Sequence, residues 1–529
     1  MDRPLRWEFP YPSQRAHVFA RNVVASSQPL ATQAGVEVLR KGGNAVDAAL
    51  ATAITLTVVE PCSNGVGSDL FAIVSDQKGL QGLNASGRSP RALNMQKFEG
   101  LESMPISGWD CVTVPGAVSG WVALSDRYGH LPFRDLFESA IQYAHDGFAV
   151  GSITARAWDL SIDRLGRYNG FRQHFLSDGR APKTGELFKR PDLARTLSSI
   201  ADTKGDSFYQ GELASAIVAQ SSREGGDFSV EDLRDHEIAW VNPIDQPYND
   251  VRLHEIPPNG QGLAALIALG ILQHLDTDSL KPNSADWVHL QAEAMKIAIR
   301  AAFDHISDPK YAQTSVEELL DPRSLKKAAE TISNRASDLP PLSLPTSQDT
   351  VYLTAADKDG QMVSLIQSNY MGFGSGIVIE GTGISMQNRG AGFSLEKAHP
   401  NELAGNKRPF NTIIPGFVTK DEQASMSFGV MGGHMQHQGH VQMVTRIYDH
   451  GENPQSASDA PRWHLTKDFE LILEAGYDPA TARKLSDRGH NVSLSNNRDL
   501  FGGAQLIYRM EEGYCAASDH RKEGMAAGF

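Results

Sequence analysis

The sequence predicts an α+β protein in which helices and strands form separate runs along the chain. Most segments before residue 349 place apolar residues at helical spacing, short β-rich runs follow Thr350, and helices return near the carboxyl end. The character of the chain changes over residues 307–349, a polar stretch that contains Pro340, Pro341 and Pro345. This break divides the chain into two parts with different patterns.

The first elements are two helices and a strand. Residues 29–40 have a helical pattern that ends at Gly42-Gly43, and Asn44 is a suitable N-cap for a second helix over residues 45–60. That second segment is apolar on nearly all sides, so we expect it to be buried. The stretch "NGVGSDLFAIVSD" that follows predicts a strand.

The middle third of the chain is predicted to be mostly helical. Apolar residues recur at helical spacing over residues 133–148, 190–222 and 285–306. Residues 255–272, "EIPPNGQGLAALIALGIL", read as a Pro/Gly loop that leads into a buried helix.

Short strands dominate after Thr350. Two β-rich runs, residues 350–356 and 362–368, flank "DKDG", a strong signal for a hairpin turn. Three further β-rich runs, "IVIEG", "TIIPGFVT" and "SMSFGVMG", precede helices predicted near residues 440–451 and 478–489.

Composition excludes several classes of function. The 529-residue chain has a net charge of −14 and no Lys/Arg block, which argues against a nucleic-acid partner. Its amino terminus shows no secretory apolar region, and the apolar run over residues 48–59 is too short to span a bilayer. Cys62, Cys111 and Cys515 form no CxxC pair, so we expect a reducing, cytoplasmic location without a membrane partner.

Thr350 has two possible roles. It is either the first residue of an ordinary strand or, if the chain cuts itself there, a new amino terminus and a nucleophile. A free α-amine, with a pKa of about 7.7–8.0, can take the proton from the threonine hydroxyl without a separate histidine. Ser364 and Ser368 lie on the second strand of the hairpin, where a hydroxyl can orient Thr350.

Two other motifs offer chemistry. Gly432-Gly433 follows a strand and opens a helix, so its backbone N–H groups either hold an oxyanion or form a plain turn. His434, His437 and His440 are spaced three apart, which turns them around a helix, and no Cys or carboxylate completes a metal site. We therefore expect no metal and no cofactor.

Several motifs together resemble the γ-glutamyltransferase family of N-terminal-nucleophile hydrolases. They occur in the family's order and at family-like spacing along most of the chain. They are "RKGGNAVDAALA", "VVEPCSNGVGSD", "TVPGAVSGW", "PPNGQG", "DTVYLTAADKDG", "GFGSGI", "NKRPFNTIIPG" and "GVMGGH".

This resemblance implies a fold and a maturation step. The fold is a four-layer αββα sandwich built from two subunits of one precursor. Cleavage falls between Asp349 and Thr350, which gives a large subunit of residues 1–349 and a small catalytic subunit of residues 350–529. The two subunits stay associated, and the heterodimer can pair into a dimer.

The resemblance also assigns roles to single residues. Thr350 takes the position of the nucleophile, and Ser368 that of the hydroxyl that interacts with it. Gly432 and Gly433 match the pair whose backbone amides form the oxyanion hole. Asn411 and Thr412 stand where a Ser-Ser pair contacts the substrate carboxylate in glutathione-processing members.

Three departures from that pattern concern the substrate. Gly392 stands where an acidic residue holds the substrate's α-amino group, and Ser86 where an arginine binds its α-carboxylate. Tyr370 replaces an asparagine near the nucleophile. Arg88 or Arg389 supplies the positive charge instead in our interpretation, which makes the sequence look like the glutathione hydrolase-like and acylase branch.

We therefore predict a self-processing amide hydrolase or acyltransferase that cleaves γ-glutamyl or related acyl amides and releases the acyl group to water or an amine. Three alternatives stay open. The first is a cephalosporin-acylase-like or other carboxy-acyl amidase that does not act on glutathione. The second is an unprocessed, non-catalytic binding or scaffold protein, and the third is a metal-dependent amidase that uses the His434 cluster.

Overall fold

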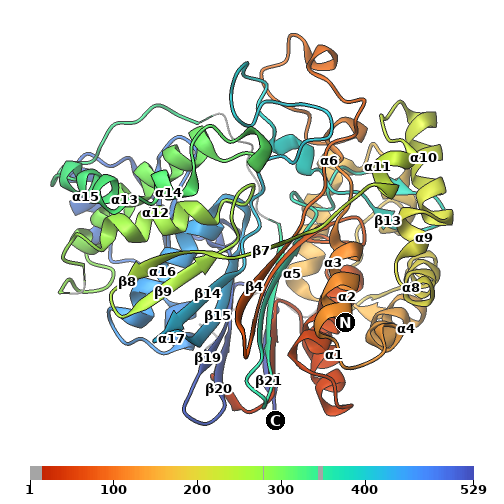
Figure 1. The fold of residues 1–529 in the computed structure, drawn as a ribbon, viewed down its shortest axis with the longest axis horizontal. Coiled ribbons are helices and arrows are strands. Elements are labelled where there is room, and N and C mark those ends of the chain that lie inside the picture. The colour runs from red at the N-terminus through yellow and green to blue at the C-terminus, as the bar shows by residue number, and fades with distance from the viewer. Residues whose placement is uncertain (1–14, 278, 343–348) are drawn as a thin grey trace, which may run out of the picture.

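Two seven-stranded sheets packed face to face form the centre of the molecule, and helices cover both outer faces (Figure 1). The computed structural model describes residues 15–277, 279–342 and 349–529. Sheet A contains, in spatial order, β1 (Val18–Ala20), β20 (Tyr514–Ser518), β19 (Gly503–Arg509), β15 (Gln423–Met431), β14 (Gly416–Lys420), β9 (Val251–Glu255) and β8 (Ile244–Tyr248). Sheet B contains β21 (Met525–Gly528), β2 (Val23–Ser26), β10 (Val351–Ala356), β11 (Met362–Ser368), β3 (Asp69–Asp76), β4 (Gly79–Ala85) and β7 (Ala239–Val241).

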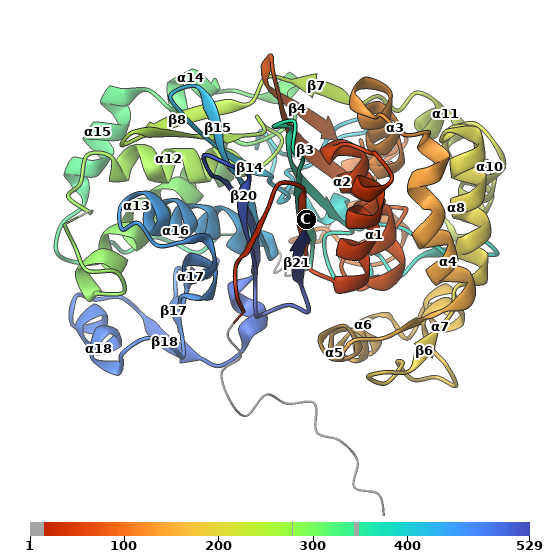
Figure 2. The same cartoon turned by 90° about the horizontal axis from the view of Figure 1, so that it is seen from below.

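Three apolar cores separate the four layers. One lies between sheet B and its helices, which include α1 (Pro29–Arg40), α2 (Ala45–Val59) and α4 (Glu138–Asp146). Another lies between sheet A and α12 (Gly262–Leu272), α13 (Ala285–His305) and α16 (Gln436–Tyr448). The third fills the space between the sheets. The α+β, four-layer prediction is confirmed, and Figure 2 shows the layers edge-on.

The period-two alternation of β10 decides which side chains face the other sheet. Val351 and Leu353 pack toward the helices, whereas Tyr352 belongs to the core between the sheets. Thr354 lies on the same face as Tyr352, and its hydroxyl is 2.6 Å from that of Ser427 on β15. Thr350, two residues before Tyr352, therefore lies at the end of the inter-sheet face.

The first two predicted helices are confirmed. Asn44 caps α2 through a capping box with Asp47, and all fifteen residues of this helix are buried. Because α2 packs between other helices and sheet B, it has no polar face. The buried helix predicted after the Pro/Gly loop is α12, which is likewise buried along its whole length.

The predicted hairpin is also confirmed. β10 and β11 pair antiparallel, with Val351 opposite Gln367, and the turn between them closes with a bond from the Gly360 N–H to the Asp357 carbonyl. Gly360 has a φ of 92°, which glycine adopts without strain. This register brings the end of β11 next to the start of β10.

Both sheets combine strands from the two sides of the Asp349–Thr350 bond. In sheet B, β10 pairs with β2 on one side and with β11 on the other, and β11 pairs with β3. In sheet A, β14 pairs with β9. The chain on either side of this bond therefore shares one pair of sheets rather than forming two separate bodies.

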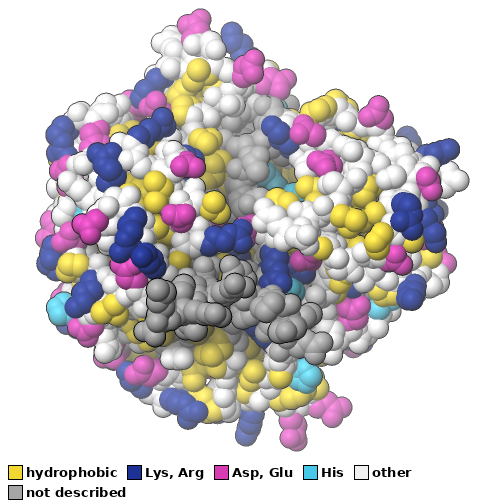
Figure 3. All heavy atoms as spheres, turned by 180° about the vertical axis from the view of Figure 1, so that it is seen from behind, with side chains coloured by type: hydrophobic (Ala, Val, Ile, Leu, Met, Phe, Trp, Pro, Cys, Tyr) yellow, Lys and Arg dark blue, Asp and Glu magenta, His cyan; other side chains and the backbone are white. Residues whose placement is uncertain are grey.

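The surface of the molecule is mixed in charge on the face that Figure 3 shows, where basic and acidic side chains lie interspersed. Among the described residues, no helix is both long and apolar enough to cross a membrane.

Candidate active site

Thr350 immediately precedes β10, and its side chain is almost completely buried, with 1% of the residue exposed. Its Oγ1 lies 3.0 Å from the Ser368 Oγ and donates to the carbonyl oxygen of Asp349 over 2.6 Å. The hydroxyl is thus held next to the peptide group that joins Asp349 to Thr350.

Ser368, the last residue of β11, reaches the same peptide group. Its Oγ donates to the Asp349 carbonyl over 3.0 Å and accepts the Tyr370 N–H over 2.8 Å. Ser364, the other serine predicted on this strand, instead contacts the Tyr352 hydroxyl at 2.7 Å. The structure therefore brings Ser368, and not Ser364, to Thr350.

The Asp349 side chain is fixed on the other side of the peptide group. Its Oδ2 accepts the Gly372 N–H over 3.0 Å. Burial raises the pKa of this carboxyl, and the positive charge of Lys522 opposes that effect. Both hydroxyls and a backbone amide thus restrain Asp349 around the predicted cleavage site.

The glycine pair links the end of β15 to α16. Gly432 and Gly433 have φ values of 129° and 57°, in the region that favours glycine, and a Cβ at Gly432 would lie 3.0 Å from the Gly502 Cα. The first residue of α16, Gln436, is buried and places its Nε2 3.5 Å from the Thr350 Oγ1. The α16 amino terminus, which favours negative charge, therefore lies beside Thr350.

Gln261 is a site residue to which sequence reasoning gave no role, although the motif "PPNGQG" contains it. Its buried Nε2 donates to the carbonyls of Thr412, over 2.6 Å, and Gly433, over 2.9 Å. One side chain thus joins the predicted substrate-binding segment to the glycine pair. The sequence analysis also assigned no role to Gln436. Its position three residues after Gly433 was the one signal that could have indicated it.

Asn411 and Thr412 are both fully buried and bind charged side chains. The Asn411 Nδ2 donates to Asp69 over 3.3 Å, and the Thr412 Oγ1 accepts from the Arg389 Nη1 over 2.8 Å. The structure therefore groups Asn411, Thr412 and Arg389 with Asp69. Their role in substrate binding stays a prediction.

Arg389 has unused hydrogen-bonding capacity in the interior. It is 0% exposed, and its guanidinium lies 4.3 Å from the centre of the Tyr370 ring. Its Nε and Nη2 have no acceptor among the residues that the structure describes. Burial lowers its pKa to about 10, so it stays charged at neutral pH. A buried cation with two free donors is suited to a carboxylate ligand.

Asp69 is the buried carboxylate whose charge interacts with that of Arg389. It accepts the Gly87 N–H and the Gln387 Nε2. Burial raises the pKa of Asp69 to about 6, while the positive charge of Arg389 opposes that shift. Asp69 therefore changes charge just below neutral pH.

Two of the predicted departures are visible in the structure. A Cβ at Gly392 would lie 2.7 Å from the Phe410 carbonyl oxygen, so the backbone there leaves no room for an aspartate without a shift. Ser86 is buried, and its hydroxyl donates to the Asn84 side chain over 2.7 Å. Neither position supplies a charge for a free amino acid head group.

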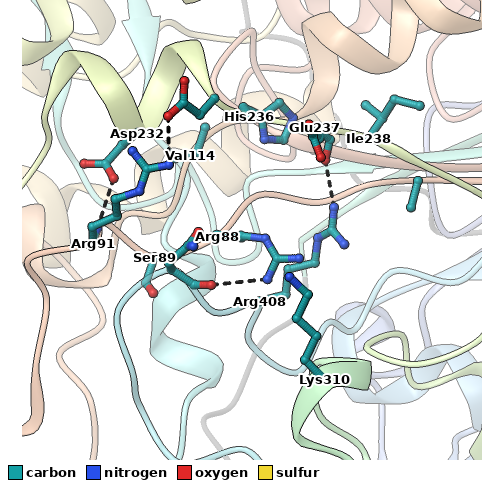
Figure 4. Close-up of a pocket in the computed structure, with 13 residues that line it drawn as sticks. Arg88, Ser89, Arg91, Val114, Asp232, His236, Glu237, Ile238, Lys310 and Arg408 are labelled. Atoms are coloured by element: carbon teal, nitrogen blue, oxygen red, sulfur yellow. Dashed lines mark hydrogen bonds and ion pairs between the residues drawn. The ribbon is translucent and has the colours of Figure 1, made fainter.

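Arg88 is not brought to Arg389. Its guanidinium forms an ion pair with Asp308, accompanied by a 3.2 Å bond to the Asn406 carbonyl, and it lines a pocket with Arg408 and Lys310 (Figure 4). Arg88 and Arg389, the two candidates for the positive charge that binds substrate, therefore lie in different surroundings.

The histidines of α16 and the turn before it do not gather around a common point. The His440 Nδ1 lies 2.5 Å from Glu255, and the His434 ring stacks on Phe410. Within the described ranges, the group with metal-ligand proximity is His289, Glu293 and His490, where Lys296 is paired with the carboxylate of Glu293 at 2.8 Å. That ammonium already neutralises the carboxylate.

The family model described as Gamma-glutamyltranspeptidase matches residues 31–529. The chain belongs to the gamma-glutamyltranspeptidase family. The family resemblance inferred from the motifs is therefore confirmed, and with it membership of a class of hydrolases and transferases that mature from a single precursor.

Relatives within the gamma-glutamyltranspeptidase family span the whole chain. The glutathione hydrolase-like YwrD proenzyme of Bacillus subtilis is 36% identical over 519 residues, covering 96% of this chain and 98% of the relative. The oxamate amidohydrolase proenzyme of Klebsiella pneumoniae is 34% identical and covers 97% and 99%. The crystal structure of cephalosporin acylase from Bacillus halodurans is 44% identical, with a TM-score of 0.95 and coverage of 100% and 99%.

Proposed function

We propose that this protein is a self-processing amidase whose nucleophile is Thr350. The observation that carries the proposal is the convergence of the Thr350 and Ser368 hydroxyls on the Asp349 carbonyl, at 2.6 and 3.0 Å. Attack of the Thr350 Oγ1 on that carbonyl carbon breaks the Asp349–Thr350 C–N bond and leaves an ester. The hydroxyl proton passes to the released nitrogen, which becomes the free α-amine of Thr350. Water then cleaves the ester into a carboxylate at Asp349 and the free hydroxyl of Thr350.

The new amine makes Thr350 a catalyst. It accepts the proton of the Thr350 hydroxyl, which attacks the substrate amide, and it passes the proton to the departing amine. Gly432 and Gly433, at the turn before α16, are suited to stabilise the oxyanion with their backbone N–H groups. The acyl group then leaves the threonyl ester to water or to an acceptor amine.

The site favours acyl groups that end in a carboxylate. Arg389, with its two free donors, provides the positive charge, and Thr412 and Asn411 hold that surface in place. Gly392 offers no carboxylate for an α-amino group, so we propose related carboxy-acyl amides rather than free γ-glutamyl compounds as preferred substrates. A γ-glutamyl amide is the second candidate, because its γ-linked acyl chain also carries a carboxylate.

Intact-mass spectrometry of the purified protein tests the nucleophile. We expect two fragments that meet at Asp349/Thr350 in place of one chain of 57.5 kDa. Thr350→Ala should stay uncut and inactive, because it has no hydroxyl to attack with. A processed and active Thr350→Ala protein would refute this mechanism.

A matched pair of anilides tests the acyl group. Glutaryl anilide carries a terminal carboxylate, and pentanoyl anilide has the same chain length without it. We expect the wild type to prefer the glutaryl compound, and Arg389→Gln to remove most of that preference, about 10- to 100-fold. A γ-glutamyl anilide cleaved faster than the glutaryl compound would favour the second candidate.

We further propose a cytoplasmic location, which is supported by Cys62, Cys111 and Cys515 being free thiols in the structure. Pairing of the processed protein into a dimer stays a prediction.

A further inference from the structure

Gln387 is a buried side chain of the candidate site that uses only part of its hydrogen-bonding capacity. It is 0% exposed, and its Nε2 donates to the Asp69 Oδ1 over 3.0 Å and to the Val114 carbonyl over 3.4 Å. Because both partners are acceptors, the orientation of the amide is fixed, and its Oε1 lies on the other side. That oxygen has no donor among the residues that the structure describes. Buried polar atoms without a partner are rare in folded proteins, and a ligand at this place would supply the missing donor.

The backbone holds Gln387 in place without any ligand. Its N–H donates to the Gly67 carbonyl over 3.1 Å, two residues before Asp69. A Cβ at Gly67 would collide with the Ser385 carbonyl oxygen, so glycine is required for this close approach of the two segments. The Gln387 amide is therefore preorganised, which lowers the entropic cost of a bond to a ligand.

A closed circle of contacts joins Gln387 to Arg389. The Asp69 Oδ2 accepts the Asn411 Nδ2 over 3.3 Å, and the Oγ1 of the next residue, Thr412, accepts the Arg389 Nη1 over 2.8 Å. Arg389 follows Gln387 by two residues, so their Cα atoms lie at most about 7 Å apart. The Gln387 Oε1 and the unpaired Nε and Nη2 of Arg389 therefore belong to one buried polar cluster around Asp69.

The unpaired atoms of this cluster define a ligand with two kinds of polar group. Two N–H donors of a guanidinium suit a carboxylate, and one carbonyl oxygen suits a group that donates a hydrogen bond. A hydroxyl or an ammonium on the carbon that bears the carboxylate places both groups side by side. With one hydrogen bond at each end, such a ligand joins protein atoms that are up to about 9 Å apart.

We propose that Gln387 is a specificity-determining residue for the acyl group. Its Oε1 accepts a hydrogen bond from a hydroxyl or an ammonium on the carbon next to the carboxylate that Arg389 holds. The proposal rests on the proposed function and narrows its substrates to acyl groups that carry a donor beside the carboxylate.

The two donor groups differ in charge. Arg389 and Asp69 carry opposite charges, so a bound carboxylate leaves one negative charge in excess when Asp69 is ionised. An ammonium cancels that charge, whereas a hydroxyl does not and depends on Gln387 alone. Replacement of Asp69 by Asn should therefore weaken ligands with an ammonium and not those with a hydroxyl.

Three anilides that differ at one carbon test the role of Gln387. They are glutaryl anilide, the 5-anilide of 2-hydroxyglutarate and γ-glutamyl anilide, which carry hydrogen, hydroxyl and ammonium next to the carboxylate. We expect the wild type to prefer at least one of the two donor-bearing compounds to glutaryl anilide about five- to tenfold in kcat/KM, and Gln387→Met to remove that preference. In Asp69→Asn, a preference that persists identifies the hydroxyl, and one that is lost identifies the ammonium.

Gln261→Met is the matched control. Gln261 is also buried, and its Oε1 is likewise without a donor in the described part of the chain, but its Nε2 bonds to Thr412 and Gly433 rather than to Asp69. This variant should slow all three anilides and keep their ratios. Glutaryl anilide cleaved by the wild type as fast as both donor-bearing compounds would overturn the proposal, and so would a preference that Gln387→Met retains.

A binding measurement separates this proposal from the proposed function. Glutarate, 2-hydroxyglutarate and glutamate carry the same three groups and contain no amide, so calorimetric titration measures their affinities without turnover. Gln387→Met should reduce the advantage of the donor-bearing acid over glutarate about fivefold, and Gln261→Met should not. If no anilide is cleaved but this change is seen, only the proposed reaction fails. Equal affinities for all three acids in the wild type would contradict the role of Gln387.

Discussion

Two hydroxyl groups from neighbouring strands hold the carbonyl at the cleavage site. Thr350 and Ser368 both bond to the Asp349 oxygen, and their own oxygens are 3.0 Å apart. In the proposed cleavage, Ser368 polarises the carbonyl that Thr350 attacks and helps to position the attacking oxygen. At the scale of the residue, we therefore expect maturation to require the Thr350 hydroxyl and to be accelerated by that of Ser368.

Replacement of Ser368 by Ala should slow processing about 10- to 100-fold, since one donor to the developing oxyanion is lost. The rate is measured as the disappearance of the intact chain on denaturing gels. Ser364→Ala is the matched control, because it removes a hydroxyl from the same strand that contacts Tyr352 instead. Equal processing rates in the two variants would contradict this role.

The charge of Asp69 should make ligand binding depend on pH. Its pKa is raised to about 6 by burial, so the carboxyl is ionised at pH 7.5 and mostly neutral at pH 5.5. When ionised, it repels a ligand carboxylate and competes for Arg389. Glutaramate has one carboxylate with a pKa of about 4.3, so it stays ionised at both pH values. It should therefore bind about three- to tenfold tighter at pH 5.5 than at pH 7.5.

The affinity is measured by titration calorimetry at several pH values, which avoids the loss of rate expected when the Thr350 amine is protonated. In Asp69→Asn, the same series should give a flat profile. A pH dependence that persists in Asp69→Asn would show that another group is responsible.

At the scale of the element, Gln261 ties α12 to two segments from the other part of the chain. It immediately precedes α12 and bonds to the Thr412 and Gly433 carbonyls. These segments carry the proposed carboxylate site and the proposed oxyanion hole. The Gln261 side chain thus sets the distance between these two proposed sites, although it contacts neither reacting atom.

Gln261→Met should lower kcat about 10-fold or more with a smaller effect on KM, because the Gly433 peptide loses its buried donor. Steady-state kinetics with glutaryl anilide measure both constants. Gln291→Met is the matched control, as Gln291 is also buried and makes two side-chain bonds, to Thr445 and Trp463, away from this site. A comparable loss of kcat in both variants would indicate general destabilisation.

At the scale of the whole molecule, the interleaved sheets should hold the two fragments together after cleavage. β10 lies between β2 and β11, and β14 pairs with β9, so separation would break ladders in both sheets and expose all three cores. Burial of apolar surface on this scale greatly exceeds what a stable interface needs.

The processed protein should therefore elute from a native sizing column as one species that contains both fragments. The fragments should separate only in denaturant, and Thr350→Ala should elute at the same volume as one chain. Separation of the fragments in native buffer would contradict the prediction that the shared sheets hold them together. A species of twice this size would support the predicted dimer.

The fold was largely predictable where local signals agree with burial. The capped, wholly apolar α2 and the hairpin of β10 and β11 follow from a few residues each, because capping and turn geometry are local interactions. The pairing order of the sheets was not predictable from periodicity, since neighbours such as β10 and β2 are more than 300 residues apart.

The sequence by itself determined the family, through motifs whose order and spacing persist along the chain, and with it Thr350, Ser368 and the glycine pair as candidates. Only the tertiary structure decided which charges act together. Arg88 and Arg389 looked equivalent in sequence, but one is paired with Asp308 in an accessible pocket and the other is buried on Tyr370. Electrostatic roles depend on distance and burial, which residue spacing does not encode for segments this far apart.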